Sequence, residues 1–152
     1  MAKATRESFG EAILEVAEKD ARLVVLDADL SKSTMTQAFM KKYPERHIEM
    51  GIAEQNMIGV AAGLALSGKV AVLTSFACFL IGRLENIRIC AAYNRTNMKL
   101  VGTHAGIGIG EDGTSQMGLE DVAAMRALPG MIVLQPADHE ETKQTVRWMI
   151  QH

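Results

Sequence analysis

The chain alternates short apolar runs of strand length with longer segments of helical periodicity. The run Leu23–Leu26 is apolar at every position, which favours a strand covered on both faces by other elements. Further strand candidates, largely apolar, follow at residues 48–50, 70–74, 98–101 and 131–134. This alternation predicts an α/β fold in three layers, with a mostly parallel sheet between two layers of helices.

Helices are expected between these apolar runs. Thr5 is placed as the N-cap of the first helix, in which Phe9, Ile13 and Val16 fall on one face. Pro44 stops the second helix. The remaining boundaries follow from the periodicity, so the later helices are expected over 34–42, 54–66, 79–93, 119–127 and 139–150.

Length, charge and cysteine content exclude several classes of protein. A chain of 152 residues corresponds to one domain, and its net charge of −2 gives no electrostatic basis for binding nucleic acid or an acidic membrane. No apolar run approaches the roughly 18 residues of a membrane span. Cys78 and Cys90 are too few for a disulfide framework, so a reducing, cytoplasmic location is expected.

Polar side chains gather where the expected strands end. In open parallel sheets, ligands bind beyond the carboxyl ends of the strands. These ends carry Asp27, Asp29, Gly51, Ser75, Phe76, Thr103, His104, Pro136 and Asp138. The set is more polar than connecting loops require, so it predicts a ligand site at this edge of the sheet.

Three partial motifs do not define a site. Residues 63–69 match most of a phosphate-binding loop, but Val70 stands where Ser or Thr belongs, and the glycines end a helix instead of preceding one. Residues 106–110 follow a strand as in a dinucleotide loop, yet no helix begins directly behind them. His47 and Glu49 alternate on a short strand, and two ligands without a third do not make a zinc site. No metal site is expected in this chain.

The most informative segment is Glu49–Met57, with the sequence EMGIAEQNM, which places Glu54 at the first turn of a helix rich in small residues. Taken alone, such an acid is most often a surface group that stabilises the helix dipole. It occurs here in order with ATRESFGEAI, VVLDADLSKST, LTSFACFLIGR and GTHAGIGIGEDGTSQMGLEDVAAMRALPG. Together these segments resemble the pyrimidine-binding domain of transketolases over essentially the whole chain. The resemblance implies one pyrimidine-binding domain over residues 1–152, with the thiamine diphosphate-binding fold of the pyrimidine type.

Close relatives of that family remain as alternatives. Deoxyxylulose-phosphate synthases and the beta subunits of 2-oxo acid dehydrogenases such as pyruvate dehydrogenase share the glutamate at the helix start, whereas the run THAGIGIGEDG is of the transketolase type. A third alternative is a regulatory α/β module that kept the fold without the chemistry. The joint presence of Glu54, Phe76, His104 and Asp112 argues against it, because no structural need explains that set.

The resemblance assigns cofactor contacts to four residues. Glu54 would hydrogen-bond the aminopyrimidine ring of thiamine diphosphate and favour the imino tautomer, whose exocyclic nitrogen removes the thiazolium proton. Phe76 and Phe79 would flank the aminopyrimidine, with Phe76 stacked on it. Asp29 resembles an acid that lies beside the cofactor in the family.

Substrate contacts follow from the same resemblance. Arg6 and Ser33 match positions that bind the sugar phosphate, and His104, a second catalytic candidate beside Glu54, matches another substrate contact. Asp112 matches the acid that recognises an acceptor hydroxyl. Many family members carry a histidine where this chain has Gln116, which leaves at most a hydrogen bond at that position.

The family's metal-binding pattern is missing from this sequence. Transketolases hold magnesium with Gly-Asp-Gly and a later Asn, but the nearest string here is Glu111-Asp112-Gly113 and no Asn follows it. The diphosphate-binding and C-terminal domains are therefore expected outside this chain, with magnesium bound by a partner domain. The chain alone is expected to be inactive, either as the first domain of a split C-terminal subunit, which the start at Met1 favours, or as a fragment of a longer enzyme.

The expected assembly is a homo- or hetero-oligomer with a diphosphate-binding subunit or domain. It would transfer a two-carbon ketol unit from a ketose phosphate, such as xylulose 5-phosphate, to an aldose phosphate. The Ala- and Gly-rich helix 54–66 is expected to face the other protein.

Overall fold

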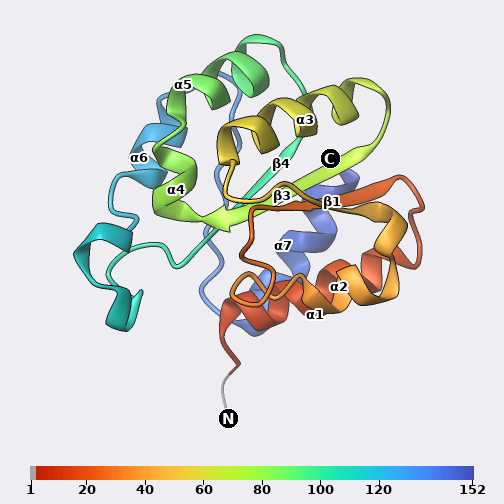
Figure 1. Cartoon of the computed structure of the whole chain (residues 1–152), viewed down its shortest axis with the longest axis horizontal. Helices are drawn as coiled ribbons and strands as arrows, with labels where there is room; N and C mark the ends of the chain where they lie inside the picture. The colour runs from red at the N-terminus through yellow and green to blue at the C-terminus, as the bar shows by residue number, and fades with distance from the viewer. Residues whose placement is uncertain (1–2) are drawn as a thin grey trace.

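Parallel strands form the centre of residues 3–152, the part of the chain that the computed structural model describes (Figure 1). They are β1 (Leu23–Asp27), β2 (His47–Glu49), β3 (Val70–Phe76) and β4 (Lys99–Thr103). Their order in the sheet is β2-β1-β3-β4, and every pairing is parallel. The predicted α/β architecture with a parallel sheet is confirmed.

Helices cover both faces of this sheet (Figure 1). On one face Leu26 and Leu73 pack in a cluster that includes α3 (Glu54–Leu66), α5 (Leu84–Ile87), the π-helical turn Arg88–Tyr93 and Met125 of α6 (Asp121–Arg126). On the other face Val25 and Val72 pack in a cluster that includes α1 (Thr5–Ala17), α2 (Gln37–Lys42) and α7 (His139–Gln151). Neighbouring strand residues thus point to opposite cores, which explains the uninterrupted apolar runs. None of the described helices is long and apolar enough to cross a membrane.

Asp27 closes β1 as a fully buried carboxylate. Its Oδ1 accepts a hydrogen bond from the backbone N–H of Leu30 at 2.7 Å. Its Oδ2 lies 2.8 Å from the hydroxyls of Thr34, Thr36 and Thr74. Because a buried charge is tolerated only when it is well hydrogen-bonded, this cluster fixes the loop after β1 to the end of β3.

Several helix starts differ from the sequence-based prediction, including those of the helices that begin at Ala77 and Asp121, and the structure explains two others. The helix expected from residue 34 begins at Gln37, since the hydroxyls of Thr34 and Thr36 bond Asp27 and Met35 has a φ of +65°. Thr5 is the first residue of α1, not its cap. The residue before it donates its backbone N–H to Glu7 Oε2 at 2.9 Å, so the acid of the first turn performs the capping.

The single helix expected over 79–93 is divided into shorter pieces. α4 (Ala77–Ile81) ends at Gly82, and Arg83, with φ −118° and ψ 28°, leaves the helical conformation before α5 begins. A π-helical turn then continues to Tyr93. The spacing of apolar residues predicts which face of a helix is buried. It does not show where the backbone hydrogen bonds of the helix are interrupted.

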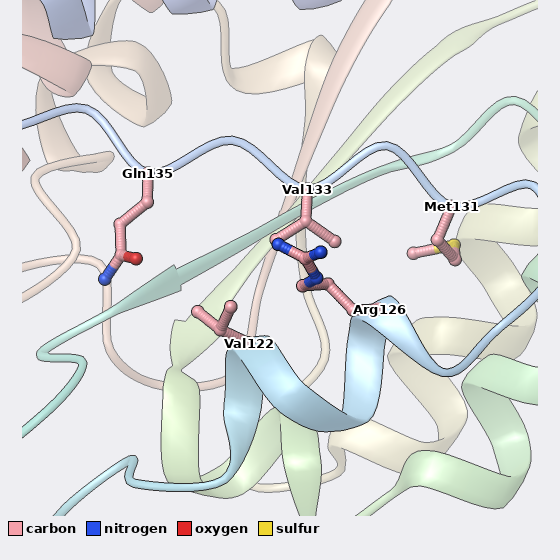
Figure 2. A pocket seen from close by; sticks show the side chains of 5 residues that line it. All are labelled: Val122, Arg126, Met131, Val133 and Gln135. Carbon is pink, nitrogen blue, oxygen red and sulfur yellow. The ribbon is translucent and has the colours of Figure 1, made fainter.

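The prediction of a strand at 131–134 is wrong, because this segment pairs with no strand among the described residues. Met131 still packs against the core, so the apolar run correctly indicates partial burial. Figure 2 shows side chains of this segment and of α6 directed toward one another. Between them lies a surface hollow of about 440 Å³. The hollow is lined by Val122, Arg126, Met131, Val133 and Gln135. An apolar run predicts burial, whereas pairing depends on backbone geometry.

We expect Asp27→Ala to lower the free energy of unfolding by about 3 kcal/mol, because buried donors left without an acceptor destabilise by roughly 1–3 kcal/mol each. Urea denaturation measures the change. Glu18→Ala is the control, since it removes an exposed ion pair with Lys42, which contributes less than about 1 kcal/mol. An equal loss in both variants would contradict a structural role for the Asp27 cluster.

Candidate active site

Glu54 lies at the first turn of α3, beside the carboxyl end of β3. Its side chain is buried, with 5% of the residue exposed. The hydroxyl of Ser75 donates a hydrogen bond of 3.0 Å to Glu54 Oε1. Among the described residues no other hydrogen bond reaches this carboxyl group. Oε2 therefore remains available to an external donor or acceptor.

An aromatic group begins at the last residue of β3. The rings of Phe76 and Phe79 are stacked, with centroids 5.4 Å apart and an interplanar angle of 9°. The imidazole of His104 lies against the same Phe76 ring at 4.2 Å. Phe76 is buried and Phe79 half-buried. The structure thus brings three of the predicted site residues into direct contact.

His104 directly follows β4 in the left-handed region, with a φ of +55°. A non-glycine residue held there is strained, and such strain is concentrated at functional sites. Its Nε2 lies 2.7 Å from Nη1 of Arg6, and its Nδ1 lies 2.9 Å from the hydroxyl of Thr103. Burial, followed by the positive charge of Arg6, lowers the pKa of His104 below 6.5, while Asp112 acts in the opposite direction.

The glycine-rich loop after His104 carries Asp112. The backbone N–H of Gly106 donates a 2.8 Å hydrogen bond to the carbonyl of Gly118, which closes the base of the loop. A Cβ at Gly118 would come within 2.8 Å of the Ala77 side chain, so α4 packs too tightly there for any other residue. Asp112 lies exposed in the 3₁₀ turn Gly110–Asp112, and a second 3₁₀ turn, Thr114–Gln116, follows. Gln116 accepts a weak 3.8 Å hydrogen bond from Cys78 Sγ.

Asp29 and Ser33 lie in the loop after β1. Asp29 is exposed with a φ of +60°, and its N–H donates to Glu49 Oε1 at 2.8 Å. The same oxygen accepts the N–H of Gly51 at 2.9 Å, so Glu49 ties the loops after β1 and β2 together. Ser33 is half-buried. No hydrogen bond within residues 3–152 joins the Asp29 or Ser33 side chain to Glu54 or His104, so these two lie at the same sheet edge without contacting that group.

Three residues that support the site received no individual role from the sequence. Glu49 bridges two loops, Ser75 bonds Glu54, and Thr103 bonds His104. Ser75 and Thr103 were placed only within the polar set at the carboxyl ends of the strands. Within residues 3–152, no cluster of three or more His, Cys, Asp or Glu side chains could hold a metal ion.

Comparison with known proteins identifies the family. The model of the transketolase pyrimidine-binding domain matches residues 1–152. A Methanocaldococcus jannaschii protein with the provisional name transketolase C-terminal section is 50% identical over 151 residues, which are 99% of this chain and 48% of that protein. Human transketolase is 40% identical over 144 residues, which are 94% of this chain and 23% of the human enzyme. This chain belongs to the transketolase pyrimidine-binding domain family.

A solved structure agrees with this assignment. A split-gene transketolase, described as an inactive beta4 tetramer, superposes with a TM-score of 0.89 at 45% identity, covering 100% of this chain and 49% of its own. The chain therefore spans about half the length of the M. jannaschii relative and of this split enzyme. These relatives favour the transketolase type over the synthase, dehydrogenase and regulatory alternatives.

We expect stability to fall as the pH drops below about 6.5. The lowered pKa of His104 means that the unfolded chain binds a proton more readily than the folded chain. The contribution of His104 to stability is therefore complete at a pH above the pKa of histidine in the unfolded chain. It is lost as the pH falls to the lower pKa that His104 has in the folded chain. His47, whose pKa is lowered by burial, contributes in the same direction.

Urea denaturation at pH 5, 6, 7 and 8 measures this dependence. His104→Gln should flatten it, because an amide oxygen can accept the Arg6 hydrogen bond without titrating. His152→Gln, at the exposed C-terminal residue, is the control. An unchanged slope in His104→Gln would contradict the assignment.

Proposed function

We propose that this chain supplies the pyrimidine-binding half of a transketolase active site and acts together with a diphosphate-binding subunit or domain. The observation that carries the proposal is the state of Glu54: it is buried, bonded by Ser75 through one oxygen and free at the other, beside Phe76 and Phe79. A carboxyl group presented in this way fits the nitrogen-bearing edge of an aminopyrimidine ring.

Thiamine diphosphate would supply the reactive carbon that takes up the two-carbon ketol unit from a ketose phosphate. On this chain, Glu54 Oε2 would share a proton with the aminopyrimidine ring nitrogen, and Ser75 would hold the carboxyl group in that orientation. Phe76 and Phe79 would flank the aminopyrimidine, with Phe76 stacked on it. Phe79 is half-buried, and the buried Phe76 ring contacts both Phe79 and His104. Asp29 would lie at the rim of the cofactor site.

Substrate contacts would come from the residues around His104. Arg6 and Ser33 would bind the phosphate of the sugar, and His104 would contact the substrate from the strained position after β4. Asp112 would accept a hydrogen bond from an acceptor hydroxyl. Magnesium and the diphosphate would be held by the partner. A cytoplasmic location and a role in pentose phosphate metabolism belong to the same proposal.

The partner surface would include α3. Its exposed Gly59 and Gly63 have no neighbour within 4 Å of an added Cβ, so the chain's own packing does not require glycine there. Interior helical glycine destabilises by about 1 kcal/mol relative to alanine. The likeness to the beta4 tetramer supports a surface that also associates with copies of itself when the partner is missing.

Reconstitution tests the function. Mixed with a diphosphate-binding subunit, thiamine diphosphate and magnesium, the chain should transfer a ketol unit from xylulose 5-phosphate to an aldose phosphate, whereas the chain alone should give no turnover. Glu54→Gln should lower kcat by about 10²–10⁴-fold, the range of acid–base contributions.

Glu85→Gln is the matched control for this assay, because Glu85 is also an acid in the first turn of a helix but lies exposed on α5. It should leave kcat unchanged. Full activity in Glu54→Gln, or the use of pyruvate as donor by the assembly, would contradict the proposal.

Gly63→Ala tests the α3 surface. The substitution should raise the stability of the chain alone by about 1 kcal/mol and weaken its association with the diphosphate-binding subunit about tenfold, because the added methyl group fills space that the partner needs. Thermal unfolding and calorimetric titration measure the two effects. Gln144→Ala on the exposed side of α7 should leave association unchanged, and unaltered binding in Gly63→Ala would remove α3 from the interface.

A further inference from the structure

The contact between Arg6 and His104 reports the protonation state of the histidine. A guanidinium group stays charged and only donates hydrogen bonds. Since Arg6 Nη1 lies 2.7 Å from His104 Nε2, that nitrogen must accept with its lone pair. The ring is therefore neutral and carries its proton on Nδ1, which agrees with the lowered pKa of His104.

The proton on Nδ1 points to Thr103. The Thr103 hydroxyl lies 2.9 Å from Nδ1 and can accept this hydrogen bond, because its own proton can be donated to the carbonyl of Ser75 at 3.5 Å. Thr103 is buried, with 7% of its surface exposed. The order of donation is thus Arg6 to His104, His104 to Thr103, and Thr103 to Ser75.

Arg6 is left with unused donors at the edge of the site. One of its five N–H groups is directed at His104. No carboxylate in the described part of the chain lies within ion-pair distance of its guanidinium, which is half-buried. A half-buried cation whose hydrogen-bond partner is a neutral ring is ready to bind an anion.

We propose that Thr103 is a positioning residue: it holds His104 as the Nδ1–H tautomer, so that Nε2 orients the guanidinium of Arg6 towards the phosphate of the sugar substrate. The inference rests on the proposed function for the identity of the anion. The tautomer itself depends only on this chain. His104 would accordingly act on the phosphate through Arg6 in addition to any direct contact with substrate.

The first measurement uses the full chain alone. Nitrogen-15 NMR of the histidine rings, with His104→Gln for assignment, should show the Nδ1–H tautomer for His104 at pH 8. Thr103→Val, of the same shape, should shift His104 towards the Nε2–H form, and Thr103→Ser should restore the original tautomer. An unchanged tautomer in a folded Thr103→Val variant would overturn the proposal.

Arg6→Met covers the case in which Thr103→Val does not fold. If Thr103 sets the tautomer, His104 should keep its proton on Nδ1 after the guanidinium is removed. A change to the Nε2–H form in Arg6→Met would assign control of the tautomer to Arg6 and overturn the proposal.

The second measurement uses the reconstituted assembly. Thr103→Val should raise KM for the ketose phosphate about tenfold, as expected when one charge-assisted hydrogen bond loses its orientation, with kcat changed less than about threefold. Thr103→Ser should restore KM. Thr142→Val, which removes another buried hydroxyl whose bond goes to the Asp138 carbonyl, should leave KM unchanged.

These two measurements separate the possible failures. An inactive wild-type assembly combined with the expected tautomers would contradict the proposed function alone. An active assembly in which Thr103→Val leaves KM unchanged, or lowers only kcat, would overturn the positioning role of Thr103.

Discussion

The carboxylate of Asp27 imposes the strictest physical requirement on this fold. A charge buried at the end of β1 is stable only when donors surround it, and here a backbone N–H and three threonine hydroxyls do so. These donors come from the loop after β1 and from β3. The hydrogen bonds to Asp27 therefore fix the path of the loop that carries Asp29 and Ser33. They also hold β3 in the position that places Ser75 and Phe76 at the site.

The number of hydrogen bonds that each carboxylate accepts separates structural from functional acids. Asp27 accepts four hydrogen bonds and is fully buried, so a ligand cannot reach it. Glu49 has one oxygen occupied by two backbone N–H groups and serves to hold the rim loops. Glu54 is as deeply buried as a core residue, yet it has a single protein donor. Its second oxygen has no partner in the described part of the chain and is not among the fully buried atoms, so it is open to a ligand that would complete its hydrogen bonds.

The sequence predicted the layers well because the apolar runs of β1 and β3 directly reflect burial on both faces. The prediction failed where the conformation of the backbone determines the secondary structure. A helix was expected from residue 34, but the hydroxyls of Thr34 and Thr36 bond the Asp27 carboxylate and the helix begins only at Gln37. The segment 131–134 is apolar and partly buried, yet it lacks strand pairing among the described residues.

The residues of the site likewise divide into those that the sequence predicted and those that only the structure showed. The resemblance to transketolases led directly to Glu54, Phe76, His104 and Arg6, since these residues stand in recognisable segments. Ser75 and Thr103 were placed at the predicted ligand edge but received no individual role, because the bonds that orient them join residues of different elements. Ser75 is 21 residues from Glu54 in the chain, and the carbonyl that Thr103 contacts is 28 residues away. A pattern along the sequence cannot report such a pair until the strands are placed side by side.

The position of α3 connects catalysis to assembly. Its first residue, Glu54, faces the site, whereas Gly59, Gly63 and Leu66 along the same helix are exposed. Beyond its first turn α3 carries only apolar residues and glycine, and such a helix is stable in water only when its outer face is also covered. On the proposed function, the partner that covers this face also brings the diphosphate site to the free oxygen of Glu54. Docking and completion of the active site would then be one event, because a rigid helix of 13 residues cannot move its outer face without moving its first turn.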